Sequence, residues 1–183
     1  MRRLTATASL LLMVLALVAA GCGGDDDASS TAAPVDEWAD DFCGAVTGWA
    51  EELRQIAEGI NDPSSLSVDA LKDAGQDASD ATDSFVEDLR ELGAPDTESG
   101  DEIGNALETL SETLETERDD LSEAVDDIDG LNDLPTAISV IGASLSSMGT
   151  ALQTTLSAFG SSDADGELET AFENSDACDD LQS

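Results

Sequence analysis

The chain has 183 residues, of which 42 are acidic and 6 are basic, and its formal net charge at pH 7 is −36. This charge argues against nucleic-acid binding, which depends on Lys and Arg side chains that neutralise phosphates. The sequence contains no His, which excludes catalytic and metal sites that need an imidazole. With so few cations to bind a phosphate or an oxyanion, we expect neither enzymatic activity nor a cofactor.

Residues 1–21 have the organisation of a secretory signal peptide. Arg2 and Arg3 supply the positive start, and an apolar run follows over residues 10–18. This run is shorter than the roughly 20 apolar residues that a membrane-spanning helix needs. The sequence therefore predicts export from the cytoplasm.

Residues 18–22, VAAGC, resemble a bacterial lipobox, in which small residues precede an obligatory Cys. The resemblance implies that Cys22 carries a diacylglycerol, that the chain is cut before it, and that its new amine is acylated, with palmitate as the expected fatty acid. Residues 22–34 then have the composition of a flexible acidic tether. The expected location is the extracytoplasmic face of the cell membrane, reached through the lipid anchor. An ordinary signal peptide cleaved after Ala20 is the alternative.

Cys43 and Cys178 remain if Cys22 is lipidated. One pair of cysteines in an oxidising compartment has one connectivity and predicts a single disulfide. A redox-active pair and a two-Cys metal site are the alternatives. The lack of Cys-x-x-Cys spacing and of a nearby cation argues against both.

Apolar residues recur at intervals of three and four from residue 35 onward, which is the spacing of one face of an α-helix. Ser67 is expected to cap the second helix, and Ser99 with Glu102 to form a capping box at the third. The predicted helices lie near residues 35–60, 67–92, 99–129 and 134–160, with a short segment over 165–175.

No segment shows strand-like alternation, and an aromatic content of 3% also disfavours a β fold. Short connections between long helices favour an antiparallel arrangement. We therefore expect residues 35–183 to form an all-α, antiparallel up-down four-helix bundle with a short C-terminal helical segment. This topology brings the start of the first helix and the end of the fourth together, so that Cys43 and Cys178 can meet.

The sequence contains three short motifs, which are Trp-x-x-x-Phe-Cys at 38–43, Leu-Gly-x-Pro-Asp-Thr-x-x-Gly at 92–100 and Ala-Cys-x-x-Leu at 177–181. These motifs resemble those of predicted lipoproteins from high-GC Gram-positive bacteria, the actinobacteria. The resemblance implies a secreted helical-bundle lipoprotein with one disulfide between its N- and C-terminal parts, and it implies no activity or site.

Residues 161–172, here called the acidic turn, match a Ca²⁺-binding EF-hand loop in part. Asp163, Asp165 and Glu169 are the candidate ligands. The last position of such a loop requires a bidentate Glu, and here it is Phe172. We therefore expect weak, diffuse association of divalent cations and no specific metal site.

The fourth predicted helix has no charged residue between positions 134 and 162. If its largest apolar residues, Ile138 and Leu145 among them, point inward at 100° per residue, a stripe of small uncharged residues points outward. This small-residue face is either a docking surface for a second copy or a partner, or a face that the C-terminal segment covers or that simply tolerates Ser and Thr. Its members are Ser139, Ala143, Ser147, Thr150 and Thr154.

Two functions from different classes remain open. The first is a membrane-tethered, non-enzymatic interaction or scaffold module. The second is a binding lipoprotein that holds a small ligand or a cation in its acidic loops or in the bundle interior, where Glu117 interrupts the third apolar stripe and Arg54 or Arg90 is a candidate partner. The acidity increases solubility or attracts a cationic partner such as a basic protein.

Overall fold

The structure is a computed structural model and describes residues 33–60, 67–163 and 165–179. The predicted signal peptide, the lipobox and most of the tether, including Cys22, lie outside the described residues. Residues 31–183 form a compact unit of their own. Its helices are α2 (Val35–Ile60), α3 (Val68–Leu92), α4 (Gly100–Asp126), α5 (Leu134–Ser162), α6 (Glu167–Asn174) and α7 (Asp176–Asp179).

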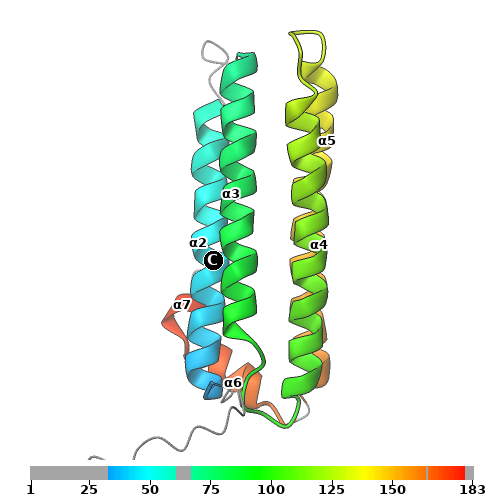
Figure 1. The fold of residues 1–183 in the computed structure, drawn as a ribbon. Coiled ribbons are helices and arrows are strands. Elements are labelled where there is room, and N and C mark those ends of the chain that lie inside the picture. Colours follow the sequence, from blue (N-terminus) through cyan, green and yellow to red (C-terminus); the bar gives the residue numbers. More distant parts are fainter. Residues whose placement is uncertain (1–32, 61–66, 164, 180–183) are drawn as a thin grey trace, which may run out of the picture. The chain divides into compact units, whose positions relative to one another are not determined.

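The four long helices run alternately up and down, and helices consecutive in sequence pack side by side (Figure 1). Helices α6 and α7 return along α2. The described residues contain no β-sheet, only an isolated bridge between Ala33 and Pro95. The predicted all-α, antiparallel up-down four-helix bundle with a short C-terminal helical segment is confirmed, and the helix ends differ from the predicted ranges by a few residues.

Helix α3 begins and ends as its sequence predicts. Ser67 caps it, because the Ser67 hydroxyl accepts a hydrogen bond of 3.1 Å from the Ala70 amide. Gly93 ends it with a φ of 60°, a conformation that glycine adopts without a steric penalty.

The predicted capping box at the start of α4 is wrong. Ser99 has φ −95° and ψ 11° and makes no side-chain cap hydrogen bond, since an N-cap residue needs an extended backbone. Its hydroxyl instead donates to the carbonyl of Ser162. This hydrogen bond joins the beginning of α4 to the end of α5.

The end of the bundle where α2 begins and α5 finishes, here called the disulfide end, has a core of aromatic rings. Trp38 stacks on Phe42 with ring centroids 5.3 Å apart, and Phe159 meets the edge of Phe42 at 5.4 Å. The Trp38 indole N–H donates to the Gly93 carbonyl at 2.8 Å. These contacts join α2, α5 and the loop after α3.

The predicted disulfide between Cys43 and Cys178 is confirmed. It joins α2 to α7 across 135 residues, with Cα atoms 5.1 Å apart. Both cysteines are buried in the main hydrophobic cluster. The disulfide therefore closes the same end of the bundle that the aromatic rings fill.

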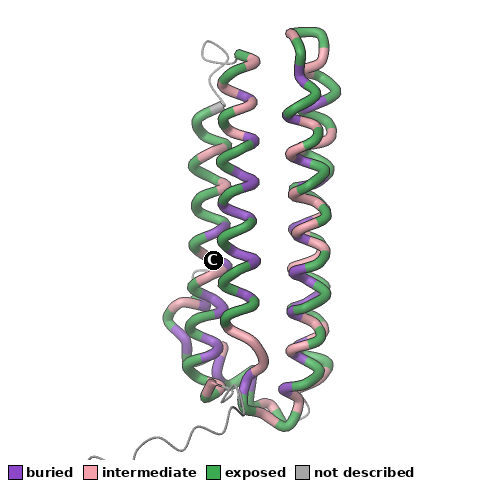
Figure 2. The backbone as a smooth tube through the Cα atoms, in the orientation of Figure 1, coloured by how far each residue is buried: buried purple, intermediate pink, exposed green. Residues whose placement is uncertain are grey.

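The opposite end, here called the far end, has a core of aliphatic side chains that are fully buried on α3 and α4, Leu71 and Leu121 among them, and only partly buried on α2. Leu121 and Val125 of α4 are buried there, but Leu53 and Ile56 of α2 are only half-buried. Gly75 allows α3 to approach α4 closely, because a Cβ at Gly75 would lie 2.2 Å from a methyl group of Val125. Figure 2 shows how burial differs along the helices.

Helix α5 is rotated relative to its predicted orientation. Ile138 and Leu145, predicted to point inward, are 48% and 38% exposed. The smaller Ala137 and Ser144 are buried in their place. The physical reason is the close packing of α5 on α4, since small residues let two helices approach and the larger side chains are displaced to the flank.

Candidate functional site

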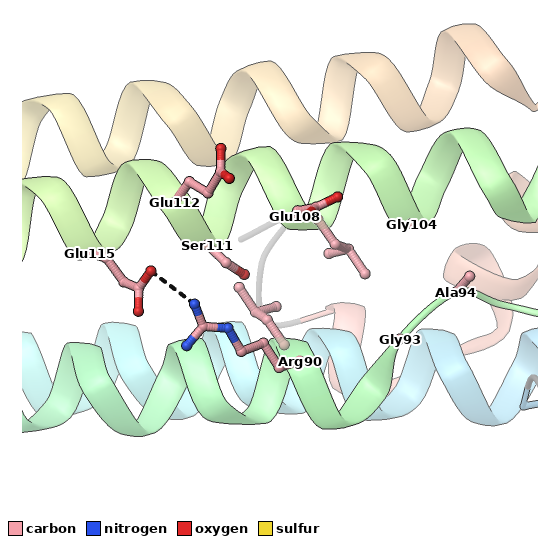
Figure 3. Close-up of a pocket in the computed structure, with 10 residues that line it drawn as sticks. Arg90, Gly93, Ala94, Gly104, Glu108, Ser111, Glu112 and Glu115 are labelled. Carbon is pink, nitrogen blue, oxygen red and sulfur yellow. Dashed lines mark ion pairs between the residues drawn. The ribbon is translucent and has the colours of Figure 1, made fainter. Parts of the chain in front are cut away.

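A cleft of about 460 Å³ lies between α3 and α4 near the disulfide end (Figure 3). Gly104 holds α4 close to the loop after α3, because a Cβ at Gly104 would lie 3.1 Å from the Cβ of Ala94. The polar side chains that line this α3–α4 cleft come from both helices. They are Arg90 of α3 and Glu108, Ser111, Glu112 and Glu115 of α4.

The α3–α4 cleft contains one ion pair between its two helices. Arg90 Nη2 lies 2.8 Å from Glu115 Oε2. Figure 3 shows Glu115 turned toward Arg90, while Glu112 points away from it. Three carboxylates against one guanidinium give the cleft a negative charge, so it attracts cations. Because the carboxylates diverge, the arrangement favours loose attraction of a cation over its coordination.

A second ionic cluster joins α3 to α4 nearer the far end. Arg118 binds Asp83 across the helix pair and Asp119 at 2.8 Å. Burial disfavours the charged guanidinium, but the hydrogen bond to Asp119 and the charge of Asp83 outweigh it and raise the pKa of Arg118 above its usual value. Arg118 thus stays charged and holds the two helices together.

Every cation in the described part of the chain is engaged with an oxygen of the protein itself. Arg54 pairs with Glu51 and Glu58 along α2, and Lys72 donates to the carbonyl of Asp126 at 3.4 Å. Together with the pairs of Arg90 and Arg118, these contacts leave an outer surface dominated by carboxylates.

Glu117 does not mark a pocket in the bundle interior. It is half-buried on α4, and its two predicted partners pair elsewhere, Arg54 with glutamates of its own helix and Arg90 with Glu115. Glu117 thus lies at the edge of the apolar stripe of α4.

The acidic turn has a structural role that the sequence analysis missed. The Asp163 carboxylate accepts hydrogen bonds from the amides of Leu168 at 3.2 Å and Glu169 at 2.8 Å. These amides open α6, so Asp163 satisfies donors that have no partner inside the helix. Asp165 and the side chain of Glu169 are exposed. Within the described ranges, no three Cys, Asp or Glu side chains form a group that could hold a metal ion.

The small-residue face lies on the outside of α5. Ser139, Ala143, Thr150 and Thr154 are exposed, and Ser147 is half-buried. The C-terminal helices pack on α2 rather than along this face. The hydroxyls of Thr150 and Thr154 donate to carbonyls of their own helix at 2.9 and 2.8 Å, which reduces the polarity that the face presents.

Comparisons with known proteins add no family to this description. No protein-family model, curated protein or solved structure matches the chain. Among the helices of the described ranges, none is both long enough and apolar enough to cross a membrane. The fold and its surfaces define the class of the protein as an acidic, disulfide-linked four-helix bundle.

Proposed function

We propose that this protein is a lipid-anchored extracytoplasmic lipoprotein whose helical bundle is a non-enzymatic interaction module. The signal sequence and the lipobox support the anchor. The exposed and uncharged outer side of α5 supports the interaction role, and it is the observation that carries the proposal. All 29 residues of α5 are uncharged, although the chain has a formal net charge of −36.

The charge pattern favours an interface along α5 for a simple reason. Charged side chains lose their hydration when a partner covers them, and the cores of protein interfaces are accordingly poor in charged residues. A partner that covers α5 displaces water from uncharged side chains only. Along α2, α3 or α4 the same partner covers carboxylates.

The anchor is tested by replacing Cys22. We expect Cys22→Ser to leave an unprocessed precursor without a lipid, measured by intact mass and by cell fractionation. The matched control is the double variant Cys43→Ser and Cys178→Ser, which loses two cysteines but keeps Cys22, and which is expected to be processed normally. Processing and membrane retention of Cys22→Ser at the level of the unmodified chain contradict the proposal.

The interaction role is tested by crosslinking on intact cells followed by pull-down. We expect a crosslinked product of defined mass, and a lower yield of it when a charge is placed on the outer side of α5. Ala143→Arg tests the small-residue face, and Glu52→Arg on the exposed side of α2 is the matched control. A chain that yields no product at any crosslinker length contradicts an interaction module.

A binding lipoprotein for a cation is the second candidate, and the carboxylates of the α3–α4 cleft favour it. Spermidine serves as the probe. If the cleft binds it, spermidine raises the melting temperature more than NaCl of equal ionic strength, and Glu115→Gln reduces the difference. If spermidine and NaCl raise the melting temperature equally, in the unmodified chain and in Glu115→Gln alike, this candidate is contradicted.

A further inference from the structure

A row of large apolar side chains is exposed along one flank of α5. Ile138, Leu145 and Leu156, here called the apolar row, are 48%, 38% and 38% exposed. At 100° per residue their side chains project within about 20° of one another. The apolar row is distinct from the small-residue face, which points further outward.

Two glycines separate the members of the apolar row. Gly142 and Gly149 project from the same flank, within about 60° of the row. Outside the helix backbone, no atom lies within 4 Å of the position that a Cβ would occupy at either glycine. The flank therefore alternates between projecting side chains and hollows that are open to an incoming side chain.

We propose that the apolar row binds a second copy of this chain, with the two α5 helices antiparallel about a twofold axis that crosses the row side of α5 at the level of Ser147. The order of residues is self-complementary about this position. Ile138 and Leu156 lie nine residues on either side of Ser147, and Leu145 and Gly149 lie two residues on either side. An antiparallel partner thus places Ile138 against Leu156 of the second copy, and Leu145 against the hollow at Gly149 of the second copy.

The same relation extends to one further pair. Gly142 and Leu152 each lie five residues from Ser147, so the half-buried Leu152 faces the hollow at Gly142 of the second copy. A twofold interface uses the same surface on both copies and requires this kind of self-complementarity. A partner of unrelated sequence does not in general carry side chains and hollows at this spacing.

The charge distribution also selects a second copy over a cationic partner. A basic protein is attracted most strongly to the carboxylates of α2, α3 and α4, and least to the uncharged α5. Two copies of this chain repel each other on every carboxylate-bearing face. They approach with least repulsion when both present α5, because its 29 residues carry no charge.

The area of the contact predicts a weak dimer. A helix of 29 residues is about 43 Å long and roughly 10 Å wide, so one copy covers on the order of 450 Å². The total is below the roughly 1,200 Å² that stable interfaces reach. Anchoring on one membrane face raises the effective concentration of such a pair, and to this extent the inference rests on the proposed function.

Sedimentation equilibrium of the full chain in a density-matched detergent tests the dimer. We expect a reversible monomer–dimer equilibrium that Ile138→Glu alone and Leu156→Arg alone each weaken by about tenfold or more. The double variant is expected to regain most of the lost affinity, because each introduced carboxylate then faces an introduced guanidinium of the second copy. Within one chain the two positions are 18 residues apart, about 27 Å along the helix, and cannot pair.

Two further variants control for folding and position. Gln76→Glu adds the same charge on the exposed side of α3, and it is expected to leave the dimer unchanged. Gly149→Leu fills a hollow without adding charge, and it is expected to weaken the dimer while circular dichroism shows an intact fold. A monomeric unmodified chain, a double variant without recovery, or equal weakening by Gln76→Glu overturns the inference. The Cys22→Ser experiment measures processing and membrane retention, whereas sedimentation measures association, so the failure of the anchor is distinguished from the failure of the dimer.

Discussion

The disulfide end and the far end of the bundle contain the same four helices but hold them together differently. At the disulfide end, aromatic rings and the Cys43–Cys178 bond join α2, α5 and α7. At the far end, Leu53 and Ile56 are only half-buried. A chain with few aromatic residues thus concentrates them where the beginning of α2 meets the end of α5, and we expect unfolding to begin at the far end.

Removal of the disulfide is expected to have the largest effect. A disulfide that closes a loop of 135 residues contributes up to about 5 kcal/mol by restricting the unfolded chain, and many contribute about 2 to 4. Denaturant unfolding of the variant with both Cys43→Ala and Cys178→Ala measures the loss. Intact mass after alkylation without reductant is expected to show both thiols protected in the unmodified chain. If the unmodified chain and the double variant are equally stable, the disulfide does not distinguish the disulfide end from the far end.

Truncation of one apolar side chain at each end compares the two cores directly. Phe42 is fully buried among aromatic rings, and Phe42→Ala is expected to cost about 3 to 5 kcal/mol. Leu53 is half-buried, so Leu53→Ala is expected to cost less than the roughly 2 to 5 kcal/mol of a fully buried leucine. Both are read from denaturant unfolding. A larger loss at Leu53 than at Phe42 would reverse the comparison.

Two glycine substitutions, one at the far end and one on α2 for comparison, test how closely α3 and α4 approach each other. Gly75→Ala forces a methyl group into Val125, and such overpacking costs about 1 to 3 kcal/mol. Gly48→Ala on α2 meets no neighbour, and it is expected to gain roughly 0.5 to 1 kcal/mol because alanine loses less conformational entropy in a helix. Thermal unfolding measures both. If Gly75→Ala stabilises the protein, α3 and α4 do not approach as closely as the structure shows.

Salt is expected to have the smallest effect, and to act mainly on the far end. Repulsion between carboxylates is screened beyond about 30 Å at 0.01 M salt but beyond about 8 Å at 0.15 M. The melting temperature should therefore rise with NaCl, and amide hydrogen exchange should slow more at the far end. CaCl₂ should act more strongly at equal ionic strength without saturating at micromolar concentration, whereas micromolar saturation would indicate a specific Ca²⁺ site in the acidic turn.

The sequence predicts the orientation of α4 better than that of α5, and the reason is charge. The apolar stripe of α4 from Ile103 to Val125 is buried as predicted, because acidic residues mark its outer side. Helix α5 has no charged residue to mark an outer side, so a helical-wheel projection alone does not decide whether Ile138 or Ser144 is buried. The position of α5 depends on how closely it approaches α4, which is a property of the packed bundle.

The candidate surfaces were predictable to different degrees for similar reasons. The disulfide followed from two cysteines with one connectivity. The α3–α4 cleft depends on the fold of the loop after Gly93 and on the contact between Gly104 and Ala94, which no local pattern encodes. The role of Asp163 as a cap of α6 depends on the left-handed turn at Gly166, with φ of 71°. A loop motif alone did not distinguish this cap from a metal ligand.

The Cys43–Cys178 bond also determines how the protein carries tension. A pull applied between the residues that precede α2 and those that follow α7 passes through the first turns of α2, across the sulfur–sulfur bond and out through α7. The chain between the two cysteines, whose sequence separation is 135, lies outside this load path. The rest of the bundle is therefore mechanically shielded, and only a force applied elsewhere on it, for example at α5, acts on the packing of the long helices.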